Sequence, residues 1–328
     1  MPSVLIAPYL LRNQPGAFRD ILTDAGFTLI DPVGDFALNA DELRRYLPDT
    51  HAMMAGGERM TPEMFAIAPH LRVIARTGVG FDLVDLKAAT ERKVAVTITP
   101  GTNQESVAEQ TVALLLAILR NVVANNYEIH RGGWDRRLVS PMRGKSLGLV
   151  GLGRIGRATA SRARAFGMTV LAYDPVAPVT DFDTQHEIIR LGLDELLAKS
   201  DAVSLHLPLS EATRGFANRD FFAKMRPGSY LINTARGGLV VEADLVASLD
   251  SKHLAGAGLD VLNHEPPEPG NPLLGRTDVI LSPHIGGTDI QSMADMADMA
   301  ARTIVQLYRN EWPEGSVVNE EIQAGWKW

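Results

Sequence analysis

The sequence predicts an α/β protein of two domains, each built around a parallel β-sheet. Short runs of apolar and β-branched residues alternate with helical patterns along the chain, which is typical of parallel α/β layers. The 328 residues are enough for about two domains, and an apolar content of 45% is enough to fill their cores. A glycine-rich turn near the middle of the chain, between a predicted strand and a predicted helix, indicates that one sheet is doubly wound.

The N-terminal part of the chain contains the first set of strands and helices. Strands are expected over residues 4–7, 52–55, 73–75 and 94–98, and helices near residues 16–25 and 82–92. None of these strands is followed by a glycine-rich phosphate loop. We therefore expect such a loop only in the other domain.

Two long helices are expected at the borders between the domains. The run Thr102-Asn103-Gln104-Glu105 has the pattern of a capping box and opens an apolar helix through residue 119. The run Thr288-Asp289-Ile290-Gln291 opens a second helix to about residue 309. Because these helices bracket the glycine turn, we expect the C-terminal tail to return to the first domain. The predicted domains are residues 1–101 with 289–328, a discontinuous flavodoxin-like unit, and residues 102–288.

The glycine turn follows a buried apolar run and opens a helix. Gly151 permits the tight turn, Gly153 leaves room for a pyrophosphate against the backbone, and Gly156 lets the helix pack closely on the strand. The helix N-terminus presents N–H groups and the positive end of its dipole to phosphates. The same turn occurs in α/β units that bind no nucleotide, so the residues around it decide the interpretation.

Asp174 ends the next apolar run, roughly 20 residues beyond the glycines, where a carboxylate would meet a ribose diol. No Arg or Lys follows at once, so a 2′-phosphate has no obvious partner, and we expect NAD rather than NADP. Further strands are expected over residues 202–205, 230–233, 255–259 and 279–282. Together with the two strands that flank the glycine turn they number six, the size of a Rossmann-type dinucleotide fold.

Four of these strands are followed by polar motifs at their carboxyl ends, where the ligands of an open parallel sheet lie. The motifs are His206-Leu207-Pro208, Asn233-Thr234-Ala235-Arg236-Gly237-Gly238, Asp260-Val261 leading to His264-Glu265-Pro266-Pro267, and Ser282-Pro283-His284-Ile285-Gly286-Gly287. We expect all four to open on the same crevice as the glycine turn.

Three of these residues suit the reduction of a ketone by a nicotinamide hydride. Arg236 can bind a carboxylate bidentately and touch the adjacent carbonyl. His284 has an intrinsic pKa suited to acid–base work near neutrality, and Glu265 beside it would favour the imidazolium and orient the ring. The alternatives are that Arg236 is an ion-pair residue at the surface, that His284 only bonds its own loop, and that Glu265 marks a turn.

Composition excludes several other classes of function. A net charge of −7 argues against binding to nucleic acid or to an anionic membrane. The chain has no cysteine, which removes disulfides, thiolate nucleophiles and Cys-ligated metal sites. The histidines show no metal-ligand spacing, so we expect no metal. No apolar stretch has the length of a membrane span and no signal peptide is apparent, so a cytoplasmic location is expected.

The motifs above resemble those of the NAD-dependent D-isomer-specific 2-hydroxyacid dehydrogenases. The runs Arg76-Thr77-Gly78-Val79-Gly80-Phe81-Asp82 and Thr99-Pro100-Gly101-Thr102-Asn103 resemble that family's substrate loop and hinge. The resemblance implies that Arg236, Glu265 and His284 are catalytic and that backbone N–H groups around Gly78, Val79 and Gly80 bind the substrate carboxylate. With the glycine turn, it implies a cofactor site formed by Gly151, Gly153, Arg154, Ile155, Gly156, Asp174, His206, Pro208, Thr213, Thr234, Ala235, Arg236, Asp260, His284 and Gly286.

Within the family the sequence resembles short D-3-phosphoglycerate dehydrogenase-like members. Arg59 lies in the loop that is near the substrate in those enzymes and could meet a phosphate, but the loop reads Gly56-Gly57-Glu58-Arg59 instead of their Arg-Ser pattern. Glu58 would repel a phosphate if it pointed towards it. The resemblance also implies a homodimer in which residues 119–141 reach the partner. The candidate substrates are glyoxylate, hydroxypyruvate and 3-phosphohydroxypyruvate.

Two other classes of protein share this fold. The C-terminal-binding-protein corepressors carry the same three residues and act as NAD(H)-sensing binding proteins, so turnover of 2-oxo acids separates the two hypotheses. Formate and phosphite dehydrogenases also share the fold, but the loop at residues 76–80 resembles the hydroxyacid pattern better.

Overall fold

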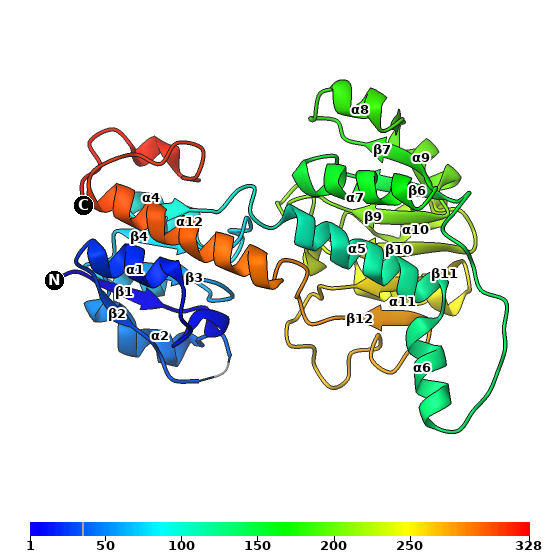
Figure 1. Ribbon diagram of the computed structural model, residues 1–328, viewed down its shortest axis with the longest axis horizontal. Helices are drawn as coiled ribbons and strands as arrows, with labels where there is room; N and C mark the ends of the chain where they lie inside the picture. Colours follow the sequence, from blue (N-terminus) through cyan, green and yellow to red (C-terminus); the bar gives the residue numbers. More distant parts are fainter. Residues whose placement is uncertain (35) are drawn as a thin grey trace. The chain divides into compact units, whose positions relative to one another are not determined.

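A computed structural model describes residues 1–34 and 36–328 and divides them into two compact units. Unit 1 comprises Met1–Asn103 with Thr288–Trp328, and unit 2 comprises Gln104–Gly287. Each unit contains one parallel β-sheet, of five strands in unit 1 and seven in unit 2 (Figure 1). The predicted α/β class with two parallel sheets is therefore confirmed.

Unit 1 has the strand order β2-β1-β3-β4-β5, which is the flavodoxin order. Its strands are β1 (Ser3–Ile6), β2 (Thr28–Ile30), β3 (Ala52–Ala55), β4 (Val73–Arg76) and β5 (Ala95–Thr97). Its helices are α1 (Ala17–Asp24), α2 (Ala40–Tyr46), α3 (Pro62–Ala66), α4 (Leu86–Glu91) and α12 (Ile290–Tyr308). One face of the sheet packs on α1 and α12 and the other on α2, α3 and α4, so the strands are apolar on both sides.

Unit 2 has the strand order β12-β11-β10-β9-β6-β7-β8, and the chain reverses its direction of winding between β6 and β9. Its strands are β6 (Ser146–Val150), β7 (Thr169–Tyr173), β8 (Ile189–Arg190), β9 (Ala202–Leu205), β10 (Ser229–Asn233), β11 (Leu254–Leu259) and β12 (Val279–Leu281). Its helices are α5 (Gln104–Leu119), α6 (Val122–His130), α7 (Arg154–Ala165), α8 (Asp181–Gln185), α9 (Leu193–Lys199), α10 (Arg219–Lys224) and α11 (Glu242–Asp250).

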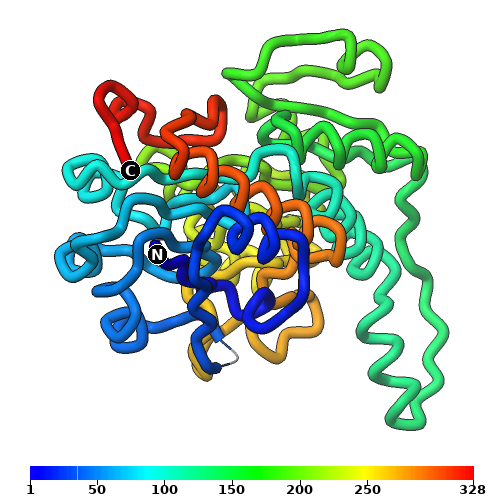
Figure 2. Tube along the Cα trace, turned by 60° about the vertical axis from the view of Figure 1, so that its left-hand side comes forward, coloured from blue at the N-terminus to red at the C-terminus, as the bar shows by residue number. Residues whose placement is uncertain are grey.

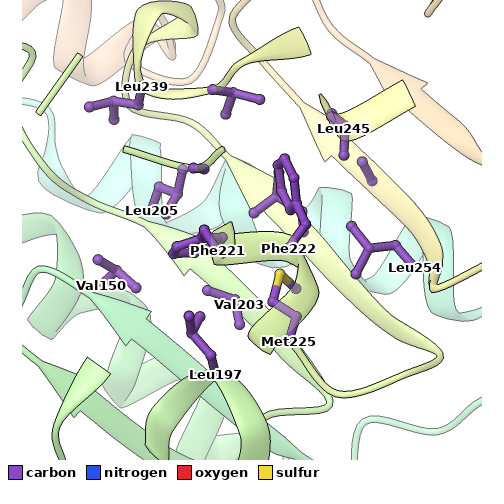
Figure 3. Packing of buried hydrophobic residues seen from close by; sticks show 14 of the residues in the cluster. Val150, Leu197, Val203, Leu205, Phe221, Phe222, Met225, Leu239, Leu245 and Leu254 are labelled. Carbon is purple, nitrogen blue, oxygen red and sulfur yellow. The ribbon is translucent and has the colours of Figure 1, made fainter. Parts of the chain in front are cut away.

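Helices cover both faces of the unit 2 sheet. One core layer joins the strands to α5 and α7, and the other joins them to α9, α10 and α11. Figure 3 shows the second layer, in which Phe221, Phe222 and Met225 pack against Val203 and Leu205 of β9. Both faces of the sheet are therefore covered, and the predicted site residues of unit 2 lie near its carboxyl edge.

The structure corrects three details of the prediction. The strands β2 and β8 were not expected, so each of the two sheets has one strand more than predicted. The expected capping box at residues 102–105 does not form, because the Thr102 hydroxyl donates to Thr99 O and Glu105 pairs with Arg162. At the second long helix the cap is Asp289, which accepts from Ser292 N, so the helix begins one residue later than the Thr288 pattern implied.

No single helix among the described residues is long and apolar enough to cross a membrane. The adjacent helices α5 and α6 would have the length and composition only when taken together, and the chain bends by 59° between them.

Candidate active site

The carboxyl ends of the unit 2 strands lie in one row. The pairing partners across the sheet are Leu281, Leu259, Asn233, Leu205, Val150 and Tyr173, each at or near the last position of its strand. The next residue of each strand therefore projects from the same edge: Ser282, Asp260, Thr234, His206, Gly151 and Asp174. The register thus brings the four polar motifs and the glycine turn to one edge.

Glycine is needed at the three positions of the turn for different physical reasons. Gly151 has φ +101°, and a Cβ there would lie 2.5 Å from His206 O. A Cβ on Gly156 would lie 2.3 Å from Gly151 O, so close packing requires both of these glycines. Gly153 is exposed, and a Cβ there would meet no described atom within 4 Å. Packing therefore does not explain Gly153, whereas a ligand approaching its backbone does.

The N-terminus of α7 is suited to an anion. Its N-cap is Gly153, which supplies no side-chain acceptor, and its first turn carries no acidic residue. The N–H groups at the helix start, including those of Arg154 and Ile155, are left for a bound group. This turn fits the pyrophosphate of a dinucleotide.

Asp174 lies beside the turn and accepts three backbone hydrogen bonds. Leu152 N donates to Oδ2 at 2.8 Å, while Val176 N and Ala177 N donate to Oδ1 at 2.9 and 2.8 Å. Partial burial raises the pKa of the Asp174 carboxyl, but the three N–H donors outweigh this effect and hold its pKa below the ordinary value. An ionised carboxylate is thus fixed beside the glycine turn.

The loop after β9 begins with a neutral histidine. His206 Nε2 lies 3.0 Å from Ser204 Oγ, and removal of the ring from water lowers the pKa of His206 to about 4. His206 is therefore uncharged at neutral pH and cannot serve as the acid of a reduction. Thr213 donates to Pro208 O at 2.6 Å and closes the turn that follows.

Glu265 and His284 are in direct contact. Glu265 Oε2 lies 2.6 Å from His284 Nδ1, and Glu265 Oε1 accepts from Leu262 N at 2.9 Å. Burial raises the pKa of the Glu265 carboxyl, but His284, Leu262 N and the charge of Arg236 together lower it below the ordinary value. The carboxylate is 37% exposed and the imidazole 47%, so a small molecule can reach the ring.

Arg236 is half-buried in the turn after β10. The buried Asn233 holds this turn, because its amide donates to Arg236 O at 2.8 Å and accepts from Ala235 N at 3.0 Å. A Cβ on Gly237 would lie 2.1 Å from Leu262 O, so only glycine allows the turn to approach residues 262–265. Sequence reasoning assigned no role to Asn233, although its place at the end of the strand was a usable signal.

Asp260 anchors the loop that carries His284. Its carboxylate accepts from Ser282 Oγ at 2.6 Å, Ile285 N at 3.1 Å and Gly286 N at 2.7 Å, and its carbonyl accepts from His284 N at 2.8 Å. The residue is 1% exposed. These bonds hold His284 at φ +55°, a conformation that is costly for a residue with a side chain.

The predicted carboxylate loop of unit 1 follows β4. Gly78 N donates to Thr99 Oγ1 at 3.0 Å, and Arg76 Nε donates to Gly80 O at 3.0 Å. Across the described chain, the N–H groups of Val79 and Gly80 have no acceptor. Of the three predicted residues, Val79 and Gly80 can thus offer an N–H to a ligand, while the N–H of Gly78 is already used.

The loop after β3, the neighbour of β4, carries Arg59. Glu58 is buried: its Oε2 accepts from Gly56 N at 2.6 Å, and its Oε1 lies 3.9 Å from the guanidinium of Arg12. The Glu58 carboxylate therefore points into the protein, towards Arg12. Arg59 is exposed and borders a hollow of about 190 Å³ shared with Thr61 and residues 82–85.

A larger hollow of about 680 Å³ lies beside α8 and β8. Its charged side chains pair with each other, Arg190 with Asp183 and Arg164 with Glu187. It is lined by none of the residues predicted for the cofactor or the substrate. We assign it no role in the site.

Comparisons with known proteins identify relatives of this chain. Residues 112–286 match the family model "D-isomer specific 2-hydroxyacid dehydrogenase, NAD binding domain". A glyoxylate reductase of Thermofilum pendens is 38% identical over 322 residues, which cover 96% of this chain and 94% of that protein. A D-3-phosphoglycerate dehydrogenase of Mycobacterium tuberculosis is also 38% identical, over 336 residues that cover 99% of this chain and 61% of that protein.

The solved D-lactate dehydrogenase from Aquifex aeolicus, complexed with NAD and lactic acid, superimposes with a TM-score of 0.84 at 25% identity. The superposition covers 97% of this chain and 99% of that one. With a family model matched over more than half of the chain, the class of protein follows. This chain belongs to the D-isomer-specific 2-hydroxyacid dehydrogenase family and is an NAD-dependent oxidoreductase.

Proposed function

We propose that this enzyme reversibly reduces a small 2-oxo acid to its D-2-hydroxy acid with NADH, and that Arg236, Glu265 and His284 are its catalytic residues. The observation that carries the proposal is the Glu265–His284 pair, 2.6 Å apart, on the same sheet edge as the glycine turn. NAD, when bound, supplies or accepts the hydride at C2 of the acid.

His284 holds and transfers the proton. Because Nδ1 faces Glu265, Nε2 is the nitrogen left for the substrate, and the carboxylate orients the ring. In reduction, Nε2 gives its proton to the carbonyl oxygen as the hydride adds to C2. In oxidation, the neutral ring takes the hydroxyl proton back, so the protons balance in both directions.

Arg236 and unit 1 bind the acid. Arg236 offers a bidentate guanidinium to the carboxylate and polarises the adjacent carbonyl. We propose residues 1–101 and 289–328 as the substrate domain, with the N–H groups of Val79 and Gly80 as further carboxylate donors. We propose Arg59 as a contact for a second anionic group of the substrate, such as a phosphate.

The candidate substrates are glyoxylate, hydroxypyruvate and 3-phosphohydroxypyruvate. Relatives at 38% identity are a glyoxylate reductase and a D-3-phosphoglycerate dehydrogenase, so identity does not choose among these acids. The experiment is NADH oxidation with a panel of phosphorylated and unphosphorylated 2-oxo acids, followed by chiral analysis of the product. Tight NADH binding with turnover of none of them would contradict the proposal and favour an NAD(H) sensor.

We propose a cytoplasmic location for the protein. We also propose that it forms a homodimer through α6 and the segment after it. Figures 1 and 2 both show this segment extending away from the rest of unit 2. It exposes large apolar side chains, namely Val122, Val123, Tyr127, Ile129, Trp134 and Leu138. An exposed apolar surface of this kind is suited to a partner, and light scattering of the purified protein would give its mass. A monomer at micromolar concentration would contradict the dimer.

A further inference from the structure

Two consecutive residues of α5 reach the two loops that carry Arg236 and His284. Gln110 Nε2 lies 2.9 Å from Ser282 Oγ, at the end of β12. Thr111 Oγ1 lies 2.8 Å from Thr234 Oγ1, at the end of β10. Ser282 and Thr234 each lie two positions before a proposed catalytic residue. One turn of α5 is therefore bonded to both catalytic loops, in each case two residues before the proposed catalytic residue.

The donors and acceptors of these contacts can be assigned. Ser282 has one hydroxyl proton, which it donates to Asp260 Oδ1 at 2.6 Å, so it accepts from Gln110. Thr111 donates its own proton to Val107 O at 2.8 Å, so Thr234 is the donor to Thr111. Gln110 thus acts as a donor and Thr111 as an acceptor, and neither contact can reverse without breaking another bond.

The first chain of bonds continues to His284. From Gln110 it passes through Ser282 to the Asp260 carboxylate, which accepts from Ile285 N and Gly286 N. These N–H groups flank His284 on its C-terminal side, and Asp260 O accepts from His284 N itself. The orientation of Asp260, which holds His284 at positive φ, is therefore set in part from α5.

Docking of α5 on the sheet does not require these polar contacts. Leu114 and Ile118 fill the spaces above Gly258 and Gly256, where an added Cβ would lie 3.0 Å from Leu114 Cβ and 2.7 Å from Ile118 Cδ1. Such apolar contacts hold a helix on a sheet but do not fix the conformation of the loops beyond the strand ends. Buried polar groups can fix that conformation when each of them has a hydrogen-bond partner.

We propose that Gln110 and Thr111 are positioning residues that set the alignment of His284 and Arg236 with the bound nicotinamide. The inference rests on the catalytic roles proposed above. It assigns the alignment of the site to α5, through Gln110 for the His284 loop and through Thr111 for the Arg236 turn. Thr111 is fully buried, and its loss leaves the buried Thr234 hydroxyl without its acceptor, so it has the larger effect.

The test compares Gln110→Leu and Thr111→Val with the wild-type holoenzyme. We expect kcat to fall about tenfold or more, since small misplacements near the reacting atoms are costly, while the dissociation constant of NADH changes by less than about threefold. We also expect a larger kinetic isotope effect with NADH deuterated at the transferred position, because the hydride step becomes slower than product release. Thr111→Ser, which keeps the hydroxyl, restores kcat.

Glu109→Gln is the matched control, because Glu109 lies on the same helix and pairs with Arg162 of α7 rather than with a catalytic loop. Unchanged kcat and isotope effect in folded Gln110→Leu would overturn the inference, as would an equal loss in Glu109→Gln. If Thr111→Val does not fold, Gln110→Met supplies the second measurement. His284→Ala in the same assay separates the two proposals: full activity there would refute the catalytic assignment itself.

Discussion

The carboxyl edges of the two sheets differ in how their polar groups are satisfied. In unit 2, the carboxylates of Asp174 and Asp260 each accept three hydrogen bonds, and Glu265 and His284 bond each other. In unit 1, Val79 N–H and Gly80 N–H have no acceptor among the described residues, and Arg59 extends into solvent. The comparison teaches that the carboxylates of the unit 2 edge are each held in one orientation by several bonds, whereas the N–H groups of Val79 and Gly80 in unit 1 are left open to a ligand.

Removal of the acid–base group tests the unit 2 edge most directly. His284→Ala should lower kcat by a factor on the order of 10² or more, because the variant lacks the proposed proton donor. The affinity for NADH, measured by fluorescence titration, should change little. His206 offers no substitute, since its pKa of about 4 keeps it neutral. A variant with wild-type turnover would remove His284 from the mechanism.

Removal of the Asp174 carboxylate, the proposed partner of the ribose, tests the cofactor part of the same edge. Asp174→Ala should weaken NADH binding by about tenfold or more, since hydrogen bonds to a charged group contribute about 1.5–3 kcal/mol. Binding of NADPH should weaken less, because the carboxylate repels a 2′-phosphate. The ratio of the two dissociation constants is the internal control for damage to the turn. A wild type that already prefers NADPH would contradict the assignment.

Neutralising Glu265 tests whether the pair at this edge acts through charge. The pKa of Glu265 is lowered, so the carboxylate is ionised across the neutral range and is protonated only as the pH falls through that value. The wild-type rate should therefore fall only at acid pH, below the ordinary pKa range of a glutamate, as the Glu265 carboxylate is protonated and loses its charge. In Glu265→Gln this acidic limb should be absent from the profile of kcat/KM against pH. An unchanged profile of kcat/KM against pH would leave Glu265 with an orienting role only.

The smallest effect is expected at the open edge of unit 1. Arg59→Ala should raise KM for a phosphorylated 2-oxo acid several-fold and leave KM for glyoxylate unchanged, because an exposed charge pair contributes about 1 kcal/mol at most. Arg45→Ala, which removes an exposed arginine of α2, serves as the control. Equal changes for both acids would show that Arg59 does not select between them.

The sequence predicted those elements that have strong local patterns. The apolar strands around the glycine turn and the two long helices were found within about two residues of their observed ends. The strands β2 and β8 were missed, because three and two residues with partly exposed side chains make no recognisable run. The capping box at residues 102–105 was misread, since Thr102 and Glu105 found other partners in the fold.

The candidate site also has features that local sequence predicts and features that depend on the tertiary structure. The sequence by itself determined the glycine turn, Asp174, and the residue types at the strand ends, because each depends on the chain immediately around it. Only the tertiary structure decided that the strand ends lie in one row, that Glu58 turns inward to Arg12, and that Gln110 and Thr111 bond loops more than a hundred residues away. Register and packing join residues that are distant along the chain, and no local pattern encodes which of them will meet.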